Sequence, residues 1–239
     1  MSHLLLVHGF PLDSRMWRAQ VEGLAGVRTV LAPDLAGHGA DRSAPATSLD
    51  GMARHLAGVL DAAGIDAVDL GGLSMGGYVV FAFLRLFPER VRSLALIDTR
   101  PGADTEAGRA GRDALAAAIR EHGAAAARDA MLPKMFAGPA SEAVRAETER
   151  MMLEQPPGTL VADVLAMRDR PDSTPDLAGI AVPTLVVVGA GDVITPPAEA
   201  EAMVAAIPGA RLELIPGAGH LAPVEQPDAV NAALRRFLS

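Results

Sequence analysis

Short apolar runs alternate along the chain with longer stretches in which apolar residues recur at helical spacing. The short runs end near Gly, Asp or Ser, and this alternation is typical of βαβ crossovers in a parallel sheet. Six runs are predicted to be strands: residues 4–7, 28–32, 67–70, 91–97, 184–188 and 211–215. The stretches between them predict helices at residues 14–24, 49–63, 74–87, 198–206 and 227–238. We therefore expect an α/β protein whose mainly parallel, doubly wound sheet is covered by helices on both faces.

The alternation stops between Asp98 and Pro183, a gap far longer than one crossover connection requires. Short helices are predicted within it at residues 103–123, 124–136, 140–154 and 160–168, broken by Pro133, Gly138-Pro139, Pro156-Pro157-Gly158 and Pro171. Parallel sheets bind ligands at the carboxyl ends of their strands, so a lid at that edge is favoured over an ordinary helical embellishment. The prediction is one domain over residues 1–239, with a core of residues 1–100 and 176–239 and a helical lid at residues 101–175.

The segment Gly72-Leu73-Ser74-Met75-Gly76 lies between a predicted strand and a predicted helix. A sharp turn at such a junction strains the backbone of the central serine and leaves room only for small residues two positions before and after it. Gly72 and Gly76 meet that need. The helix that follows would direct its free N–H groups toward the same point and favour an anionic intermediate. Ser74 is therefore the candidate nucleophile, although the five-residue pattern by itself also arises by chance.

A serine hydroxyl needs a base to take its proton and a carboxylate to orient that base. Among the six histidines, His220 follows the last predicted strand in a glycine-rich loop, where it can reach the strand ends. His38 could also approach a site, but a turn histidine bonded to the backbone is the simpler interpretation. Surface, packing or distant positions are expected for His3, His55 and His122.

The candidate for the orienting acid is Asp192, which follows the predicted strand at residues 184–188 in a glycine-rich loop. Ser, Asp, His is then the chain order expected of a strand-turn-helix nucleophile. Asp98 ends the fourth predicted strand and is the rival acid at an adjacent place. Asp34 and Asp69 are expected to be solvated and to form turns.

Acyl transfer also needs hydrogen-bond donors for the developing oxyanion. The residue after the nucleophile, Met75, supplies one backbone N–H by position. The loop His8-Gly9-Phe10-Pro11 follows the first predicted strand, and Phe10 would supply the second N–H, with Gly9 allowing close backbone approach. An ordinary strand-ending turn is the alternative for His8-Gly9 alone.

The composition limits which binding partners and which cellular location we expect for the protein. A formal charge of −8 opposes binding to nucleic acid or anionic lipid, and the absence of cysteine removes disulfides and thiolate chemistry. The start of the chain has no basic leader, and no apolar run is long enough for a membrane helix. We expect a cytoplasmic protein that binds a small molecule and contacts neither nucleic acid nor membrane. The oligomeric state stays open, a homo-oligomer included.

Together these motifs resemble the α/β-hydrolase superfamily over essentially the full length of the chain. The matching residues are His8-Gly9-Phe10, the segment from Pro33 to Gly39, the segment from Gly72 to Gly77, Gly191-Asp192 and Gly219-His220. The Gly-Leu-Ser-Met-Gly-Gly form is similar to that of small lid-bearing esterases and lactonases, including the 3-oxoadipate enol-lactonase-like group. The resemblance implies a serine hydrolase that cleaves a carboxylic ester or lactone and needs no metal or organic cofactor.

The resemblance leaves other functions open. Thioester, amide and carbon–carbon hydrolysis and perhydrolysis use the same scaffold, and a non-enzymatic small-molecule receptor is a further alternative. The insert offers chiefly Leu, Met and Ala with Phe136, so we expect an apolar pocket for a small or medium acyl group. Arg100, Arg168 or Arg170 could instead bind a substrate carboxylate, although solvated surface roles are the simpler interpretation.

Overall fold

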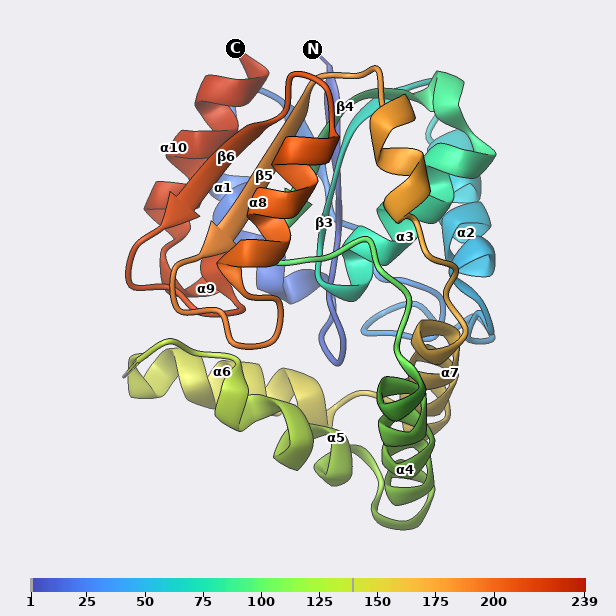
Figure 1. The fold of residues 1–239 in the computed structure, drawn as a ribbon. Coiled ribbons are helices and arrows are strands. Elements are labelled where there is room, and N and C mark those ends of the chain that lie inside the picture. The colour runs from blue at the N-terminus through green and yellow to red at the C-terminus, as the bar shows by residue number, and fades with distance from the viewer. Residues whose placement is uncertain (1, 139) are drawn as a thin grey trace.

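A computed structural model describes residues 2–138 and 140–239 of the chain. Its centre is a parallel sheet of six strands in the order β2-β1-β3-β4-β5-β6 (Figure 1). The strands are β1 (His3–Val7), β2 (Thr29–Leu31), β3 (Val68–Leu73), β4 (Val91–Ile97), β5 (Thr184–Gly189) and β6 (Arg211–Ile215). The predicted fold class and all six predicted strands are confirmed.

The largest change in strand length is at β3, which continues through Gly71 and Gly72 to Leu73, beyond the predicted end at residue 70. Both glycines are paired with β4, Gly71 with Ala95 and Gly72 with Leu96. A Cβ atom on Gly71 would lie 2.9 Å from Leu6 Cδ2 and 3.3 Å from Ala95 Cβ, so glycine lets the side chains of β1 and β4 pack closely against this strand. A pair of glycines that looks like a turn in the sequence is therefore the end of a central strand.

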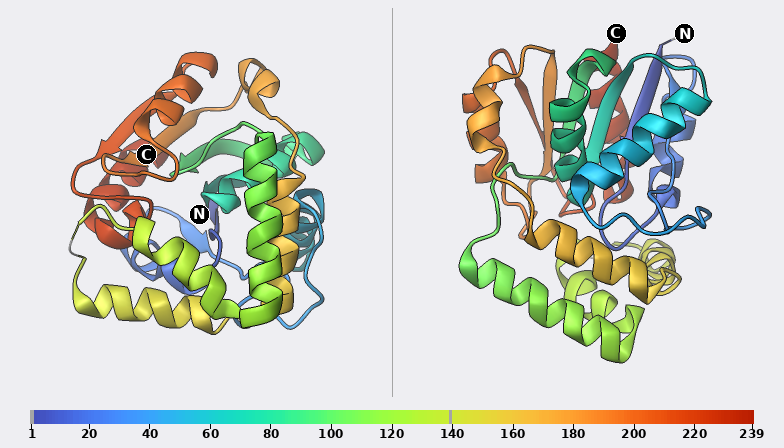
Figure 2. Two further views of the ribbon diagram at one scale, coloured as in Figure 1. Left: turned by 60° about the horizontal axis from the view of Figure 1, so that its bottom comes forward. Right: turned by 90° about the vertical axis from the view of Figure 1, so that its right-hand side faces the viewer.

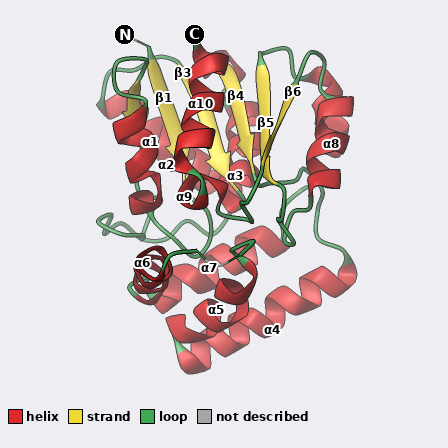
Figure 3. Cartoon of the chain, turned by 90° about the vertical axis from the view of Figure 1, so that its left-hand side faces the viewer, coloured by secondary structure: helices red, strands yellow, loops and turns green. Residues whose placement is uncertain are grey.

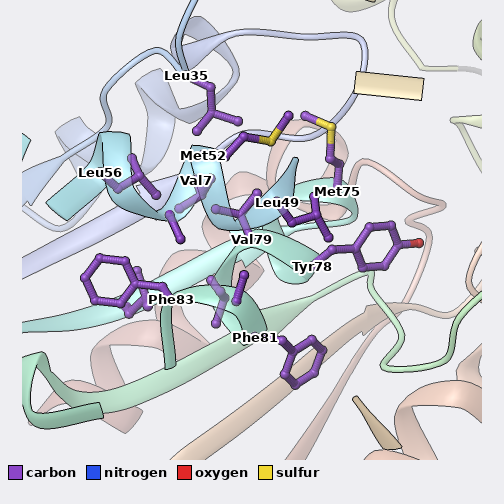
Figure 4. Packing of buried hydrophobic residues seen from close by; sticks show 14 of the residues in the cluster. Val7, Leu35, Leu49, Met52, Leu56, Met75, Tyr78, Val79, Phe81 and Phe83 are labelled. Carbon is purple, nitrogen blue, oxygen red and sulfur yellow. The ribbon is translucent and has the colours of Figure 1, made fainter. Parts of the chain in front are cut away.

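Helices cover both faces of the sheet (Figure 3). One hydrophobic core joins the sheet to α2 (Leu49–Ala62), α3 (Met75–Leu86) and α8 (Pro197–Ala206), and Figure 4 shows its centre around Met52, Val79 and Phe83. The second core lies on the opposite face. It is formed with the 3-10 helix η1 (Ser14–Trp17), Leu24 directly after α1 (Arg18–Gly23), α9 (Ala222–Glu225) and α10 (Pro227–Leu238).

The insert, residues 101–175, lies across the carboxyl-terminal edge of the sheet (Figures 1 and 2). It contains the helices α4 (Glu106–His122), α5 (Ala124–Met131), α6 (Glu142–Leu153) and α7 (Pro157–Arg168). The short 3-10 helix η3 (Leu132–Lys134) follows α5, and a second one, η4 (Thr174–Gly179), begins at the end of the insert. Gly123, with φ of 69°, separates α4 from α5. The predicted break at Pro139 lies outside the described residues, as does Met1.

The expectations for the helix at residues 14–24 and for Asp69 were also wrong. The helix expected at residues 14–24 is divided into η1 and α1, with Asp13 capping the first turn by accepting a hydrogen bond from the Arg15 N–H. Asp69 is not a solvated turn residue, because its side chain is buried within β3 and accepts hydrogen bonds from Arg28 Nε at 2.7 Å and Ser93 Oγ at 2.8 Å. A buried charge needs such partners.

None of the helices in the described part of the chain has the length and apolar character needed to cross a bilayer.

Candidate active site

Ser74 lies at the junction between β3 and α3, in a left-handed backbone conformation with φ of 54°. Non-glycine residues adopt this conformation only at a cost, which the surrounding packing has to hold. Gly72 and Gly76 permit the turn, since a Cβ on Gly72 would meet the Gly76 carbonyl and one on Gly76 would meet the Val7 carbonyl. The Thr99 hydroxyl donates a hydrogen bond of 2.8 Å to the Ser74 carbonyl and fixes the turn from β4's side.

The structure brings Ser74, His220 and Asp192 together, although up to 146 positions separate them along the chain. His220 Nε2 lies 2.9 Å from Ser74 Oγ, and His220 Nδ1 lies 2.8 Å from Asp192 Oδ2. The His220 and Asp192 side chains are fully buried. With Nδ1 protonated and bonded to the carboxylate, Nε2 is free to accept the serine proton.

Asp192 has further partners that hold its carboxylate in place. The Thr195 hydroxyl donates to Oδ2 at 2.6 Å, while the N–H groups of Ile194 and Thr195 donate to Oδ1 at 2.8 and 3.0 Å. Burial raises the pKa of Asp192, but the hydrogen bond and charge of His220 and the bonds from Thr195 lower it by more. Its net pKa is therefore below the ordinary value, and the carboxylate stays ionised beside His220.

Asp98, the rival acid, is bonded to backbone instead of to His220. Its Oδ1 accepts the N–H of Gly189 at 2.8 Å, and its Oδ2 accepts the N–H of Ala222 at 3.3 Å. Burial and the neighbouring Asp192 charge raise its pKa well above the ordinary value. Asp98 thus joins the end of β5 to the start of α9, beside the loops that carry Asp192 and His220.

The two candidate oxyanion donors lie next to the serine. Met75 is the first residue of α3, so its N–H has no acceptor within the helix. The loop after β1 approaches from the other side: a Cβ on Gly9 would lie 3.4 Å from Ser74 Cβ, and Phe10 follows. Glycine at position 9 favours this approach, because its Cβ would also lie 2.7 Å from Leu73 Cδ2 and 3.1 Å from the Leu73 carbonyl oxygen.

The sequence suggested that His38 is bonded to the backbone of its own turn, and this interpretation was wrong. Its Nε2 lies 2.8 Å from Asp163 Oδ2 of α7, with both side chains buried. Burial lowers the pKa of His38, but the Asp163 charge and hydrogen bond and the nearby backbone of Ala36 and Leu35 raise it by more. This second His–Asp pair joins the core to the insert.

His8 packs beside His38, with 4.7 Å between the ring centroids. Its Nε2 accepts the Leu35 N–H at 3.0 Å, which requires a neutral ring. Burial and the neighbouring His38 charge lower the pKa of His8 to about 3. His8 therefore stays neutral and holds the loop after β1 against the loop after β2.

The three candidate arginines differ in their surroundings. Arg168 forms surface ion pairs with Asp113 and Asp169. Arg170, in contrast with the solvated role expected of it, is buried: its guanidinium lies 4.4 Å from the Tyr78 ring centroid and pairs with Asp104 at 2.8 Å. Arg100 also pairs with Asp104, at 3.2 Å.

Three residues that the sequence analysis did not select support the site: Thr99, Thr195 and Glu225. Glu225 Oε1 accepts the N–H of Gly219, the residue before His220, at 2.7 Å. A threonine or glutamate in a loop carries no sequence signal of this role. Of the three, only Thr195 could have been predicted from the sequence, because it lies three residues after Asp192 and a threonine at that spacing can bond the aspartate side chain. Among the described residues, no group of three or more His, Asp or Glu side chains is arranged to hold a metal ion.

Comparisons with known proteins show the family to which the chain belongs. A family model described as the alpha/beta hydrolase fold matches residues 2–227. The chain is similar to the thermophilic esterase from Thermogutta terrifontis, with 40% identity, a TM-score of 0.94 and coverage of 100% of this chain and 89% of that one. It is also similar to the enol-lactonase from Burkholderia xenovorans LB400, with 27% identity, a TM-score of 0.91 and coverage of 99% and 91%.

A longer relative is the dihydrolipoyllysine-residue acetyltransferase component of the acetoin cleaving system of Pseudomonas putida, with 34% identity over 245 residues. The match covers 98% of this chain but only 63% of that protein. The family match covers most of the chain, as do the likenesses to an esterase and an enol-lactonase. The chain therefore belongs to the alpha/beta hydrolase fold family, and it is a hydrolase of that family.

Proposed function

We propose that the protein cleaves a carboxylic ester or lactone through an acyl-enzyme formed on Ser74. The observation that carries the proposal is the continuous hydrogen-bonded path from Ser74 Oγ to His220 Nε2, at 2.9 Å, and from His220 Nδ1 to Asp192 Oδ2, at 2.8 Å. These distances are within the range at which a base takes a hydroxyl proton. The esterase and the enol-lactonase to which the chain is similar support this substrate class.

In the proposed reaction, Ser74 Oγ attacks the carbonyl carbon while His220 Nε2 takes the hydroxyl proton. The ionised Asp192 stabilises the imidazolium that forms. The carbonyl electron pair moves to oxygen, where the N–H groups of Phe10 and Met75 donate hydrogen bonds. His220 then gives its proton to the leaving alkoxide, and a water molecule activated by the same base releases the acid from Ser74.

The substrate is proposed to have an apolar acyl or alcohol group of small or medium size. A cavity of about 300 Å³ lies between η1 and α1 on one side and α6 on the other. Its walls are mostly apolar and include Leu12, Met16, Met151 and Val224. Leu12 lies in the loop after β1, two positions after Phe10, and Val224 lies in α9, four positions after His220. The cavity is therefore lined by segments next to the proposed site, whereas Ser74, His220 and Asp192 are not among its lining residues.

Labelling by a serine-directed organophosphonate tests the proposed nucleophile. The wild type should bind one phosphonyl group per chain by intact-mass measurement, and peptide mapping should locate it on Ser74. The Ser74→Ala variant should not react. A folded wild type that is not labelled would overturn the enzyme assignment and leave a binding protein of the same fold.

A panel of p-nitrophenyl esters of increasing acyl length, beside neutral and dicarboxylic lactones, tests the substrate class. We expect the highest kcat/KM among neutral esters or lactones of short to medium length. A preference for a dicarboxylic lactone over every neutral ester would contradict the apolar group and would direct attention to Arg100.

A further inference from the structure

A cluster of contacts outside the proposed triad joins the insert to the loop that carries His220. On the insert side is the segment at residues 135–137, directly after η3; we call it the 135–137 segment. The Leu221 N–H donates a hydrogen bond of 3.2 Å to the Met135 carbonyl. The Ala137 N–H donates to Glu225 Oε2 at 3.0 Å, while Glu225 Oε1 accepts the Gly219 N–H at 2.7 Å.

These bonds hold both chain neighbours of His220. Leu221 is bonded to the insert directly, and Gly219 is bonded to it through the two oxygens of one carboxylate. Glu225 is half-buried at the end of the short helix α9, so its bonds to N–H groups are charge-assisted and only partly screened by water. The backbone on either side of the base thus depends on the insert for its position.

The 135–137 segment also packs against the loop that carries Asp192. A Cβ atom on Gly191 would lie 2.6 Å from Ala137 Cβ, and one on Gly219 would lie 2.5 Å from Ala137 N. Real Cβ atoms do not approach other atoms so closely, so glycine is needed at both positions. One segment of the insert therefore touches the loop of the acid and the loop of the base at the same time.

We propose that the 135–137 segment and Glu225 are positioning elements that hold His220 and Asp192 in line with Ser74. The inference rests on the proposed function and extends it, because it assigns the insert a role in aligning the triad in addition to covering the site. Reaction rates respond steeply to such alignment, and a shift of about 1 Å can cost about a hundredfold. Loss of one of these contacts should therefore lower kcat more than it raises KM.

The first test compares Glu225→Gln with Glu213→Gln. Glutamine keeps one carbonyl acceptor but turns an NH2 group toward the second N–H donor, so one of the two bonds is lost. We expect kcat for a p-nitrophenyl ester to fall about tenfold in Glu225→Gln, with KM within about twofold. Glu213 undergoes the same change of charge on β6, where it pairs with Arg236, and should keep wild-type kcat.

The second test introduces and then removes a clash across the same contact. Gly191→Ala should lower kcat by about tenfold, because the new methyl group meets Ala137 Cβ. Adding Ala137→Gly removes that atom and leaves the new Cβ at distances of 3.4 and 3.5 Å from its nearest remaining neighbours. The double variant should recover kcat to within about twofold of Ala137→Gly alone, which keeps the Ala137 N–H bond to Glu225 and serves as the reference.

A purely structural role predicts a different result: a lower melting temperature with unchanged kcat per phosphonate-reactive serine. That result in Glu225→Gln, or a Gly191→Ala variant that Ala137→Gly does not rescue, would overturn the inference. If Glu225→Gln does not fold, the comparison of Gly191→Ala with and without Ala137→Gly tests the inference instead. A wild type that is not labelled at Ser74 would instead overturn the proposed function.

Discussion

Two buried histidines are bonded to aspartates at the same distance of 2.8 Å, His220 to Asp192 and His38 to Asp163. The first pair joins the loops after β6 and β5, and the second joins the loop after β2 to α7. They differ in what the second ring nitrogen meets. His220 Nε2 faces the Ser74 hydroxyl at 2.9 Å, whereas His38 Nδ1 is buried and has no hydrogen-bond partner among the described residues.

The comparison teaches that a buried His–Asp pair is not by itself evidence of catalysis. A base needs a nucleophile within hydrogen-bond reach, which only His220 has of the two. The His38–Asp163 pair is part of a set of buried contacts between the core and α7. In the same region Thr159 Oγ1 donates to the Gly37 carbonyl at 3.1 Å. This pair therefore contributes to docking of the insert.

The largest expected effect is the difference in kcat between two variants in which the same substitution replaces each histidine in turn. His220→Gln should lower kcat about 10⁴-fold or more, because the serine loses its base. His38→Gln should keep kcat within about threefold in the folded fraction. Ester hydrolysis by both variants, normalised to folded protein, measures the difference. Equal losses would mean that His38 contributes to the chemistry.

The next effect separates the aspartates. Asp192→Asn should lower kcat about 10³- to 10⁴-fold, since the amide no longer fixes the Nδ1-protonated ring or stabilises the imidazolium. Asp163→Asn should change kcat by less than about threefold.

Asp98→Asn provides a sharper control, because Asp98 is the buried carboxyl closest in kind to Asp192. It should lose much less activity than Asp192→Asn, as its oxygens accept backbone N–H groups of Gly189 and Ala222. If Asp98→Asn lowered kcat as much as Asp192→Asn does, Asp98 would be the acid that supports His220.

The role of the second pair should appear in stability. Asp163→Asn leaves His38 buried beside a weaker partner, and removing one member of a buried pair costs about 3 kcal/mol. We expect a decrease of that order in the free energy of unfolding by urea. Asp169→Asn, a change on the exposed side of the same region, should alter it by less than about 1 kcal/mol. Similar values for the two variants would argue against a docking role.

The smallest effect is the pH dependence of that stability. The pKa of His38 is raised above its ordinary value of 6.5, so the folded state binds its proton more tightly than the unfolded state does. Its contribution is fully present below about pH 6.5 and is lost as the pH rises through the raised pKa. Burial also raises the pKa of Asp163, so its contribution changes with pH in the same direction. The difference in unfolding free energy between the wild type and a His38→Gln/Asp163→Asn double variant, which removes both titrating groups, should therefore be larger at pH 6 than at pH 9. A difference that grows with pH would contradict this sign.

The sequence could predict the features that depend on local patterns. The six strands are short apolar runs, and the buried β5 is continuously apolar from Leu185 to Val188, as a strand covered on both faces must be. Gly72 is required by the local backbone, because its Cβ would meet the Gly76 carbonyl, whereas Gly76 is required by the approach of Val7 in β1. The spacing of the two glycines around Ser74 nevertheless made the turn recognisable in the sequence. The chemistry expected of Ser74, His220 and Asp192 followed from residue types at the ends of these strands.

Tertiary structure decided which of several similar groups meet. Asp98 and Asp192 both follow buried strands, and His38 and His220 both lie in glycine-containing loops, so their sequence surroundings barely distinguish them. The direction in which each side chain leaves its loop depends on contacts with distant segments, such as α7 for His38 and the 135–137 segment for His220. Hydrogen bonds require atoms to be within about 3 Å of each other, and only the packing of the whole chain fixes distances on that scale.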